Sequence, residues 1–258
     1  YQHLVAWIQV LRALQPKSGV TEIGIEDPEA GNADDVTVYK ENQAREYFQV
    51  KSSVDAREAI GVDWLTEPTR AGGPSVIQRF YNVWAGEQVG HRPRLVLVTN
   101  RPAAIGDPVM SLRDGRDGTV ARRLKLVRSN SKAGVARKQL AAHLEVTEEE
   151  MLNFLDDLHF TVGRLYDEWM EQASQLMFMV GLRHDDEAIT LGISTVRGWV
   201  TGGTRRLTLA EIREAVKSLD GPEELPSALL LVQAIERDPM PESALIALDW
   251  VDLFPGDG

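Results

Sequence analysis

Two neighbouring stretches decide the fold: Asp34-Asp35-Val36-Thr37-Val38-Tyr39 and, after a polar connection, Glu46-Tyr47-Phe48-Gln49-Val50-Lys51. Apolar and polar residues alternate in both. That alternation predicts β-strands, because successive side chains of a strand point to opposite faces of the sheet. The polar residues between the two stretches are typical of a hairpin connection. We therefore expect two paired strands here.

The alternation also assigns side chains to faces of this hairpin. On the second strand, Phe48 and Val50 point toward the core, while Gln49 and Lys51 share the opposite, polar face. The valines of the first strand take its core positions, so Asp35 lies on the polar face. If the strands pair, the carboxylate of Asp35 comes close to the amide of Gln49 and the ammonium of Lys51.

The elements around the hairpin alternate between helix and strand. Apolar residues at positions 4, 7, 8, 11 and 14 follow a helical period, and Pro16 ends that helix. Strands are expected over 20–26 and 94–100, and a helix over 75–88. The first hundred residues thus predict helix, strand, strand, strand, helix, strand, which is an α/β arrangement with helices flanking a mixed sheet.

After about residue 130 the pattern becomes helical. Helices are expected over 133–143 and 161–180, and two more begin at Thr147 and Thr208, each followed three residues later by a glutamate as in a capping box. The sequence therefore predicts an α/β part followed by a helical part, with the change near 125–145.

Charge and cysteine content limit the chemistry. The 258 residues carry a net charge of −11 and no cysteine, which excludes disulfides, thiol nucleophiles and Cys-ligated metals. The charge is uneven: −4 over 1–60, +8 over 61–140 and −15 over 141–258. A local basic field of this kind can hold DNA even in an acidic protein. No apolar run reaches the roughly 20 residues that span a bilayer, so a cytoplasmic protein is expected.

The polar face of the hairpin suits a divalent cation. Mg²⁺ prefers oxygen ligands, here the Asp35 carboxylate, the Gln49 side-chain oxygen and the Val50 carbonyl. The metal would acidify water and offset charge on a phosphodiester, while Lys51 orients the nucleophile or stabilises the pentavalent state. The alternative is a surface hairpin with unrelated polar residues, because a lone Q-x-K occurs by chance in many proteins.

These residues resemble the D…QxK variant of the PD-(D/E)XK nuclease superfamily. Gln2 at the head of the first helix and Glu26 before the Asp-Asp pair also resemble that group, in which such residues support the site. The resemblance implies a restriction-endonuclease-like core over 1–130 that cuts double-stranded DNA with Mg²⁺, for which Mn²⁺ can substitute. Gln2, Glu26, Asp35, Gln49 and Lys51 would form its site.

A second resemblance concerns the end of the sequence. Residues 247–257, Ala-Leu-Asp-Trp-Val-Asp-Leu-Phe-Pro-Gly-Asp, resemble the junction before a SAVED sensor domain in nuclease effectors of CBASS, a bacterial anti-phage system. This implies a helical extension over 131–245 and a linker over 246–258. It further implies a sensor domain outside the chain that binds a cyclic oligonucleotide. Cutting both strands of a duplex needs two active sites, so we also expect a homo-oligomer in the active state.

Two departures from the family pattern leave alternatives open. The chain has two consecutive aspartates where the family needs one, so a one-residue register shift would make Asp34 the metal ligand instead of Asp35. The next ligand is the neutral Gln49, which favours one metal ion over two. A different class of function is therefore also weighed: a non-catalytic DNA-binding or assembly module with a degenerate nuclease fold.

The basic run over 120–128 supplies candidate phosphate contacts. Arginine presents a planar fork that suits phosphate oxygens. The expected contacts are Arg122, Arg123, Lys125 and Arg128. The alternative is that the basic middle of the chain pairs with its acidic last third within the molecule.

Overall fold

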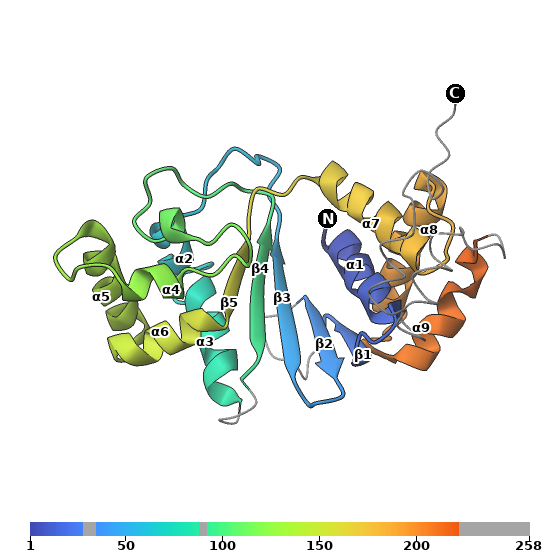
Figure 1. Cartoon of the computed structure of the whole chain (residues 1–258), viewed down its shortest axis with the longest axis horizontal. Helices are drawn as coiled ribbons and strands as arrows, with labels where there is room; N and C mark the ends of the chain where they lie inside the picture. The colour runs from blue at the N-terminus through green and yellow to red at the C-terminus, as the bar shows by residue number, and fades with distance from the viewer. Residues whose placement is uncertain (28–34, 88–91, 222–258) are drawn as a thin grey trace, which may run out of the picture.

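The computed structural model describes residues 1–27, 35–87 and 92–221 (Figure 1). In this part of the chain the strands form one six-stranded sheet, in the order β5-β4-β3-β2-β1-β6. The pairs β3–β4 and β4–β5 are parallel and the others antiparallel, so the sheet is mixed. The strands are β1 (Val20–Ile25), β2 (Val36–Lys40), β3 (Arg45–Lys51), β4 (Arg94–Thr99), β5 (Leu158–Thr161) and β6 (Arg206–Thr208).

Helices cover both faces of this sheet, which confirms the predicted α/β class with a mixed sheet between helices. In Figure 1, α2 to α6 lie on one side of the strands, and α1 with α7 to α9 on the other. The helices are α1 (Gln2–Leu14), α2 (Val62–Thr66), α3 (Val76–Gly86), α4 (Ala121–Lys125), α5 (Lys132–Leu144), α6 (Glu148–Asp156), α7 (Tyr166–Met179), α8 (Asp186–Thr201) and α9 (Leu209–Val216).

The predicted hairpin is present and in the predicted register. Val36 lies opposite Phe48, and Thr37 opposite Tyr47. Phe48 packs in the core on the α1 side of the sheet, whereas Tyr47 packs in the core on the α3 side. Gln49 and Lys51, at odd positions like Tyr47, therefore point toward the α3 side.

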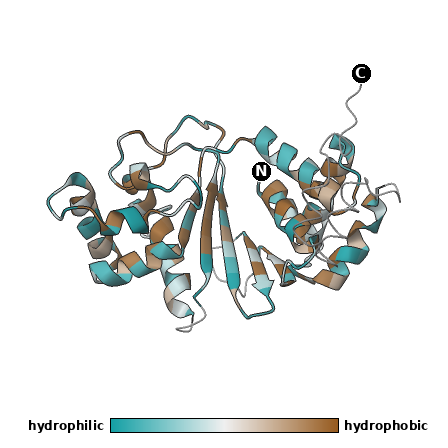
Figure 2. Ribbon diagram, in the orientation of Figure 1, coloured by the Kyte–Doolittle hydropathy of each residue, from teal (hydrophilic) through white to brown (hydrophobic). Residues whose placement is uncertain are grey.

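Two hydrophobic cores hold the layers together. The first joins the sheet to α1, α7, α8 and α9, and the second joins it to α2 through α6. Figure 2 shows the hydrophobic residues of α1 and of the central strands between the two groups of helices. Trp7 of α1 is fully buried in the first core. Burying a large apolar side chain contributes about 1.5–3 kcal/mol, so α1 is held mainly by this contact face.

The wholly helical second part was a wrong prediction. Residues Leu158–Thr161 form β5, so the helix expected from 161 begins only at Tyr166, and Arg206–Thr208 add β6 to the opposite edge of the sheet. Both strands are too short to show a repeated alternation. The helix α8 was not predicted either. The domain boundary at residue 130 stays a prediction, and the expected linker over 246–258 lies outside the described residues.

Within the described ranges, the structure contains no helix that is both long enough and apolar enough to cross a bilayer.

Candidate active site

Asp35 and Gln49 meet at the end of the hairpin, as the alternation predicted. The backbone N–H of Asp35 donates to the carbonyl of Phe48 over 2.8 Å, which extends the β2–β3 ladder by one residue. Asp35 thus faces Gln49 across the strands. The Gln49 Nε2 donates to Asp35 Oδ2 over 2.6 Å, and the backbone N–H of Val50 donates to the same oxygen over 2.6 Å.

This geometry fixes the carboxylate firmly. Hydrogen bonds to an ionised acceptor are roughly twice as strong as those between neutral groups. Gln49 is only 5% exposed, so its bond to Asp35 is shielded from water. The amide nitrogen faces the carboxylate here, so a cation shared by Asp35 and Gln49 would require the amide to turn over and present its oxygen.

Gln2 and Glu26 also meet, at the same end of the sheet. The Gln2 Nε2 donates to Glu26 Oε1 over 3.1 Å, while Arg205 Nη1 lies 3.0 Å from Glu26 Oε2. The backbone N–H of Glu26 donates to the Asp35 carbonyl over 3.0 Å. Glu26 therefore joins the start of α1, the entry to β6 and the backbone of Asp35, which is a supporting position.

Lys51 ends β3 two residues after Gln49 and on the same face. It lies beside Thr99 in the parallel β3–β4 pair and is half-buried. Among the described residues, no carboxylate lies within ion-pair distance of its ammonium group. Asp34, the alternative ligand, lies outside the described residues.

The sequence reasoning missed the residues that fix the loops at this end. The Asn100 side chain accepts from the N–H of Ser53 over 2.9 Å and donates to its carbonyl over 2.7 Å. Arg101 lies 2.6 Å from Glu58 in an ion pair. These contacts bind the loop after β3 to the loop after β4. The signal available was the polar pair Asn100-Arg101 directly after a buried strand.

A buried carboxylate near the site was missed as well. Asp27 is 5% exposed and accepts from the hydroxyl of Tyr39 over 3.1 Å. Burial first, and the nearby Asp27 charge second, raise the pKa of Tyr39. The guanidinium of Arg206 stacks over the Tyr39 ring at 4.0 Å. Asp27 is therefore a structural acid held in place by its neighbours.

The donor set can be compared with the needs of Mg²⁺. Within the described ranges, no three His, Asp or Glu side chains gather as a metal-binding group. The predicted set is one carboxylate, one amide oxygen and one backbone carbonyl, all hard oxygen donors of the kind Mg²⁺ prefers. Asp35 Oδ1 accepts no hydrogen bond from the described residues, so it is the oxygen able to bind a cation. These residues could hold a single ion only after the Gln49 amide has turned over to present its oxygen.

The predicted DNA contacts lie on α4 and just beyond it, away from this pair. Arg122, Arg123 and Lys125 are exposed on the short helix, and Arg128 follows it. Figure 1 places α4 among α2, α5 and α6. Lys125 pairs with Asp156, a residue of the acidic last third.

A buried contact of the same kind supports the alternative of internal pairing. Arg137, 8% exposed, lies 2.6 Å from Glu148 and donates to the carbonyl of Leu124 over 3.0 Å. Part of the basic middle of the chain is thus neutralised by the acidic last third. Arg122 and Arg128 have no such partner among the described residues, so their predicted contact with phosphate stays a prediction.

Comparison with known proteins gives structural similarities only. No protein-family model and no curated protein matches the chain. The chain is similar to the Acinetobacter baumannii Cap4 SAVED/CARF-domain containing receptor with the cyclic trinucleotide 3'3'3'-cAAA, with a TM-score of 0.48 and 9% identity over 84% of this chain and 44% of that chain.

Two further structures give similar values. The same receptor with 2'3'3'-cAAA has a TM-score of 0.47 and 10% identity over 92% of this chain and 45% of that chain. The Moraxella osloensis Cap4 receptor has a TM-score of 0.45 and 11% identity over 84% and 46%. The chain thus spans less than half the length of these structures, and such identities say nothing of individual site residues.

Proposed function

We propose that this chain is the nuclease part of an anti-phage effector and cuts double-stranded DNA with the help of Mg²⁺. One observation carries the proposal: the hairpin brings the Asp35 carboxylate and the Gln49 amide into contact at the strand end where Lys51 follows on the same face. A carboxylate, an amide and an ammonium group at one end of a mixed sheet suit phosphodiester hydrolysis.

Each residue then has a role set by its position. Asp35 and Gln49, with the Val50 carbonyl, hold the metal, which supplies positive charge against the phosphate when bound. Lys51 orients the attacking water or stabilises the charge that builds on the phosphorus oxygens. Gln2 and Glu26 position the start of α1 beside the backbone of Asp35. The Val50 N–H keeps the carboxylate at one orientation.

The proposed cleavage activity would be controlled by a sensor domain. We propose that a cyclic oligonucleotide bound by a SAVED domain outside this chain activates cutting. The structures compared above include receptors with that domain in complex with cyclic trinucleotides. Cleaving both strands of a duplex needs two active sites, so the active form is expected to be a homo-oligomer.

Plasmid cleavage tests the proposal. Wild type and Lys51→Ala are incubated with supercoiled DNA in Mg²⁺, Mn²⁺ or EDTA. We expect loss of cleavage in EDTA and a fall of about 10²–10³-fold in the variant, the range for removing one group that stabilises transition-state charge. The matched control is Lys138→Ala, an exposed lysine on α5. Equal cleavage by wild type and Lys51→Ala would contradict the assignment.

One observation favours the alternative, a non-catalytic DNA-binding module. The Gln49 amide donates its hydrogen bond to Asp35, so the pair is satisfied without a cation. Titration with Mn²⁺ separates the two functions. A catalytic site predicts saturable binding that Asp35→Asn abolishes, whereas a degenerate site predicts DNA retention that neither Mn²⁺ nor this substitution changes.

A further inference from the structure

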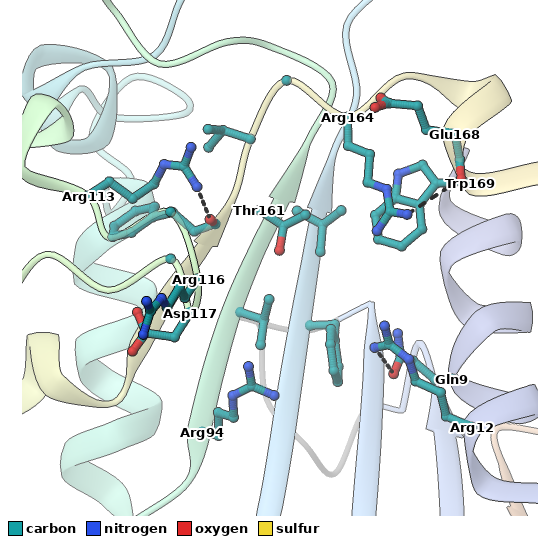
Figure 3. A pocket seen from close by; sticks show the side chains of 18 residues that line it. Gln9, Arg12, Arg94, Arg113, Arg116, Asp117, Thr161, Arg164, Glu168 and Trp169 are labelled. Atoms are coloured by element: carbon teal, nitrogen blue, oxygen red, sulfur yellow. Dashed lines mark hydrogen bonds between the residues drawn. The ribbon is translucent and has the colours of Figure 1, made fainter. Parts of the chain in front are cut away.

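A groove lined by arginines lies on the face of the sheet opposite Gln49 and Lys51. It is a cavity of about 490 Å³ between α1, α7, the strands β3 to β5 and the loop over 113–118 (Figure 3). Phe48, Val96 and Val98 form its floor, and these side chains belong to the core on the α1 side. The groove is therefore separate from the Asp35–Gln49 pair.

Five arginines line this groove from four parts of the chain. Figure 3 shows Arg12 on α1, Arg94 on β4, Arg113 and Arg116 on the loop, and Arg164 before α7, arranged around one space. With the two acidic residues that also line it, Asp117 and Glu168, the groove carries a net charge of +3. This is a dense positive charge for a cavity of that size.

The two carboxylates of the groove form no ion pair with these arginines. The Asp117 carboxylate accepts from the N–H of Thr119 over 2.9 Å and from its hydroxyl over 2.8 Å. Glu168 Oε2 accepts from the N–H of Leu165 over 2.6 Å, capping the start of α7. Both acids thus satisfy backbone groups of their own segments.

The arginines themselves are held by neutral groups, with one weak exception. Arg12 donates to Gln9 Oε1 over 3.3 Å, Arg113 donates to the Phe160 carbonyl over 3.4 Å, and Arg164 stacks on the Trp169 ring at 4.1 Å. Arg94 lies 3.7 Å from Glu46, which already pairs with Lys40. Among the described residues, Arg116 has no carboxylate within ion-pair distance. Within the described residues, four of the five groove guanidinium groups therefore lie without a carboxylate partner.

The neighbouring arginines of the groove act on the pKa of Arg12. Burial first, and then the charges of Arg164 and Arg94, lower the pKa of Arg12. The guanidinium stays charged at neutral pH. Like charges that face one cavity repel one another, and an anion bound among them would offset that repulsion. Phosphate oxygens are the anions that the arginine fork matches best.

The groove is longer than a single small anion requires. A second hollow of about 440 Å³ shares Gln9, Arg12 and Arg94 with the first and continues toward Lys40 and Glu46 at the hairpin turn. A polymer with repeated phosphates would fill such a path, whereas one phosphate would fill only part of it.

We propose that this arginine groove binds the phosphate groups of a nucleic-acid strand, at a site apart from the Asp35–Gln49 pair. The choice of DNA as that strand rests on the proposed function. The binding itself requires neither a metal nor the residues of the hairpin. Under this proposal the main phosphate contacts lie in the groove and not on α4.

Fluorescence anisotropy with a short labelled DNA duplex in EDTA tests this without cleavage. The variant Arg12→Gln/Arg116→Gln removes two of the four groove arginines that make no ion pair with a carboxylate of the described residues. We expect its affinity to fall about tenfold or more, and the slope of log affinity against log salt to fall by about 2, one for each lost phosphate contact. Arg197→Gln/Arg213→Gln, exposed on α8 and α9, removes the same charge elsewhere and should change affinity less than about twofold.

Three outcomes overturn the proposal: the groove variant binds DNA like wild type, the control variant loses as much affinity as the groove variant, or Arg122→Gln/Arg123→Gln on α4 loses more. Binding of pyrophosphate without arginine-dependent binding of DNA also overturns it, since the groove would then be a small-anion site. A thermal melt guards against unfolding, because relief of repulsion should leave the Tm of the groove variant unchanged or higher. Failure of Lys51→Ala to affect cleavage would refute the proposed activity but leave this result standing.

Discussion

The hairpin end and the arginine groove lie on opposite faces of the same strands, and they differ in how their charges are satisfied. At the hairpin end, the Asp35 charge is met by two short hydrogen bonds from Gln49 and Val50. In the groove, five arginines face one space and the two carboxylates there bind backbone groups. The Asp35 charge is thus met by hydrogen bonds from neighbouring residues, whereas in the groove the arginines outnumber the carboxylates by three. We infer that affinity for nucleic acid and chemistry on it are separable in this molecule.

The largest expected effect is the loss of both sites at once, because the hairpin end and the arginine groove both depend on α1. Trp7 lies fully buried at the centre of that helix, and a Cβ at Gly192 of α8 would lie 2.4 Å from its ring. Trp7→Ala should cost about 3–5 kcal/mol of unfolding free energy, as large-to-small core substitutions do. Chemical denaturation measures it. Phe178→Ala, at a side chain 40% exposed, is the control and should cost much less.

DNA cleavage and DNA binding should be lost together in Trp7→Ala. If either survives at the wild-type level, α1 does not connect the two sites.

A smaller effect would separate the cleavage rate, set at the hairpin end, from the DNA affinity, set in the arginine groove. Asp35→Asn should lower the cleavage rate by about 100-fold or more while DNA affinity in EDTA stays unchanged, because the substitution removes the charge that holds the metal. Arg12→Gln/Arg116→Gln should do the reverse, with weaker binding and an unchanged rate at saturating DNA. Single-turnover cleavage over a range of DNA concentrations separates the two parameters. If both variants change both parameters equally, the two faces act as one site.

The smallest expected effect is a dependence of stability on pH at the edge of the groove. Burial lowers the pKa of His159 from its usual 6.5, while its Nδ1 lies 2.8 Å from the Asp117 carbonyl. The folded state therefore favours the neutral ring. This contribution is complete above pH 6.5 and is lost as pH falls below that value. Melting curves between neutral and mildly acid pH should show a smaller decrease in Tm for His159→Gln than for wild type. An identical decrease in both would assign the pH dependence to other groups.

The sequence predicted the hairpin because alternation over two adjacent stretches buries the valines and Phe48 on one face. It also named Asp35 and Gln49 as neighbours on the other face, although it left Asp34 as an alternative under a one-residue shift. The strands β5 and β6 could not be predicted, since four and three residues carry no usable period and their place depends on tertiary pairing. The wholly helical second part was wrong for that reason.

The arginine groove could not be predicted from the sequence, for a different reason. Its arginines come from residues 12, 94, 113, 116 and 164, and no local pattern relates them. The sequence instead favoured the dense basic run on α4, where Lys125 turns out to pair with Asp156. The local density of basic residues pointed to the surface of α4 as the DNA contact. The charge of the arginine groove depends instead on which distant segments the sheet brings together.

The position of Glu26 has a practical consequence. Its carboxylate joins Gln2, near one end of the described chain, to Arg205, near the other. The segment that carries Arg205 also supplies β6, and α7 and α8 cover α1. Deletion mapping would therefore mislead: a fragment ending at residue 130 would lose the cover of α1, the outer strands and the partner of Glu26 at once, and its inactivity would not locate the active site.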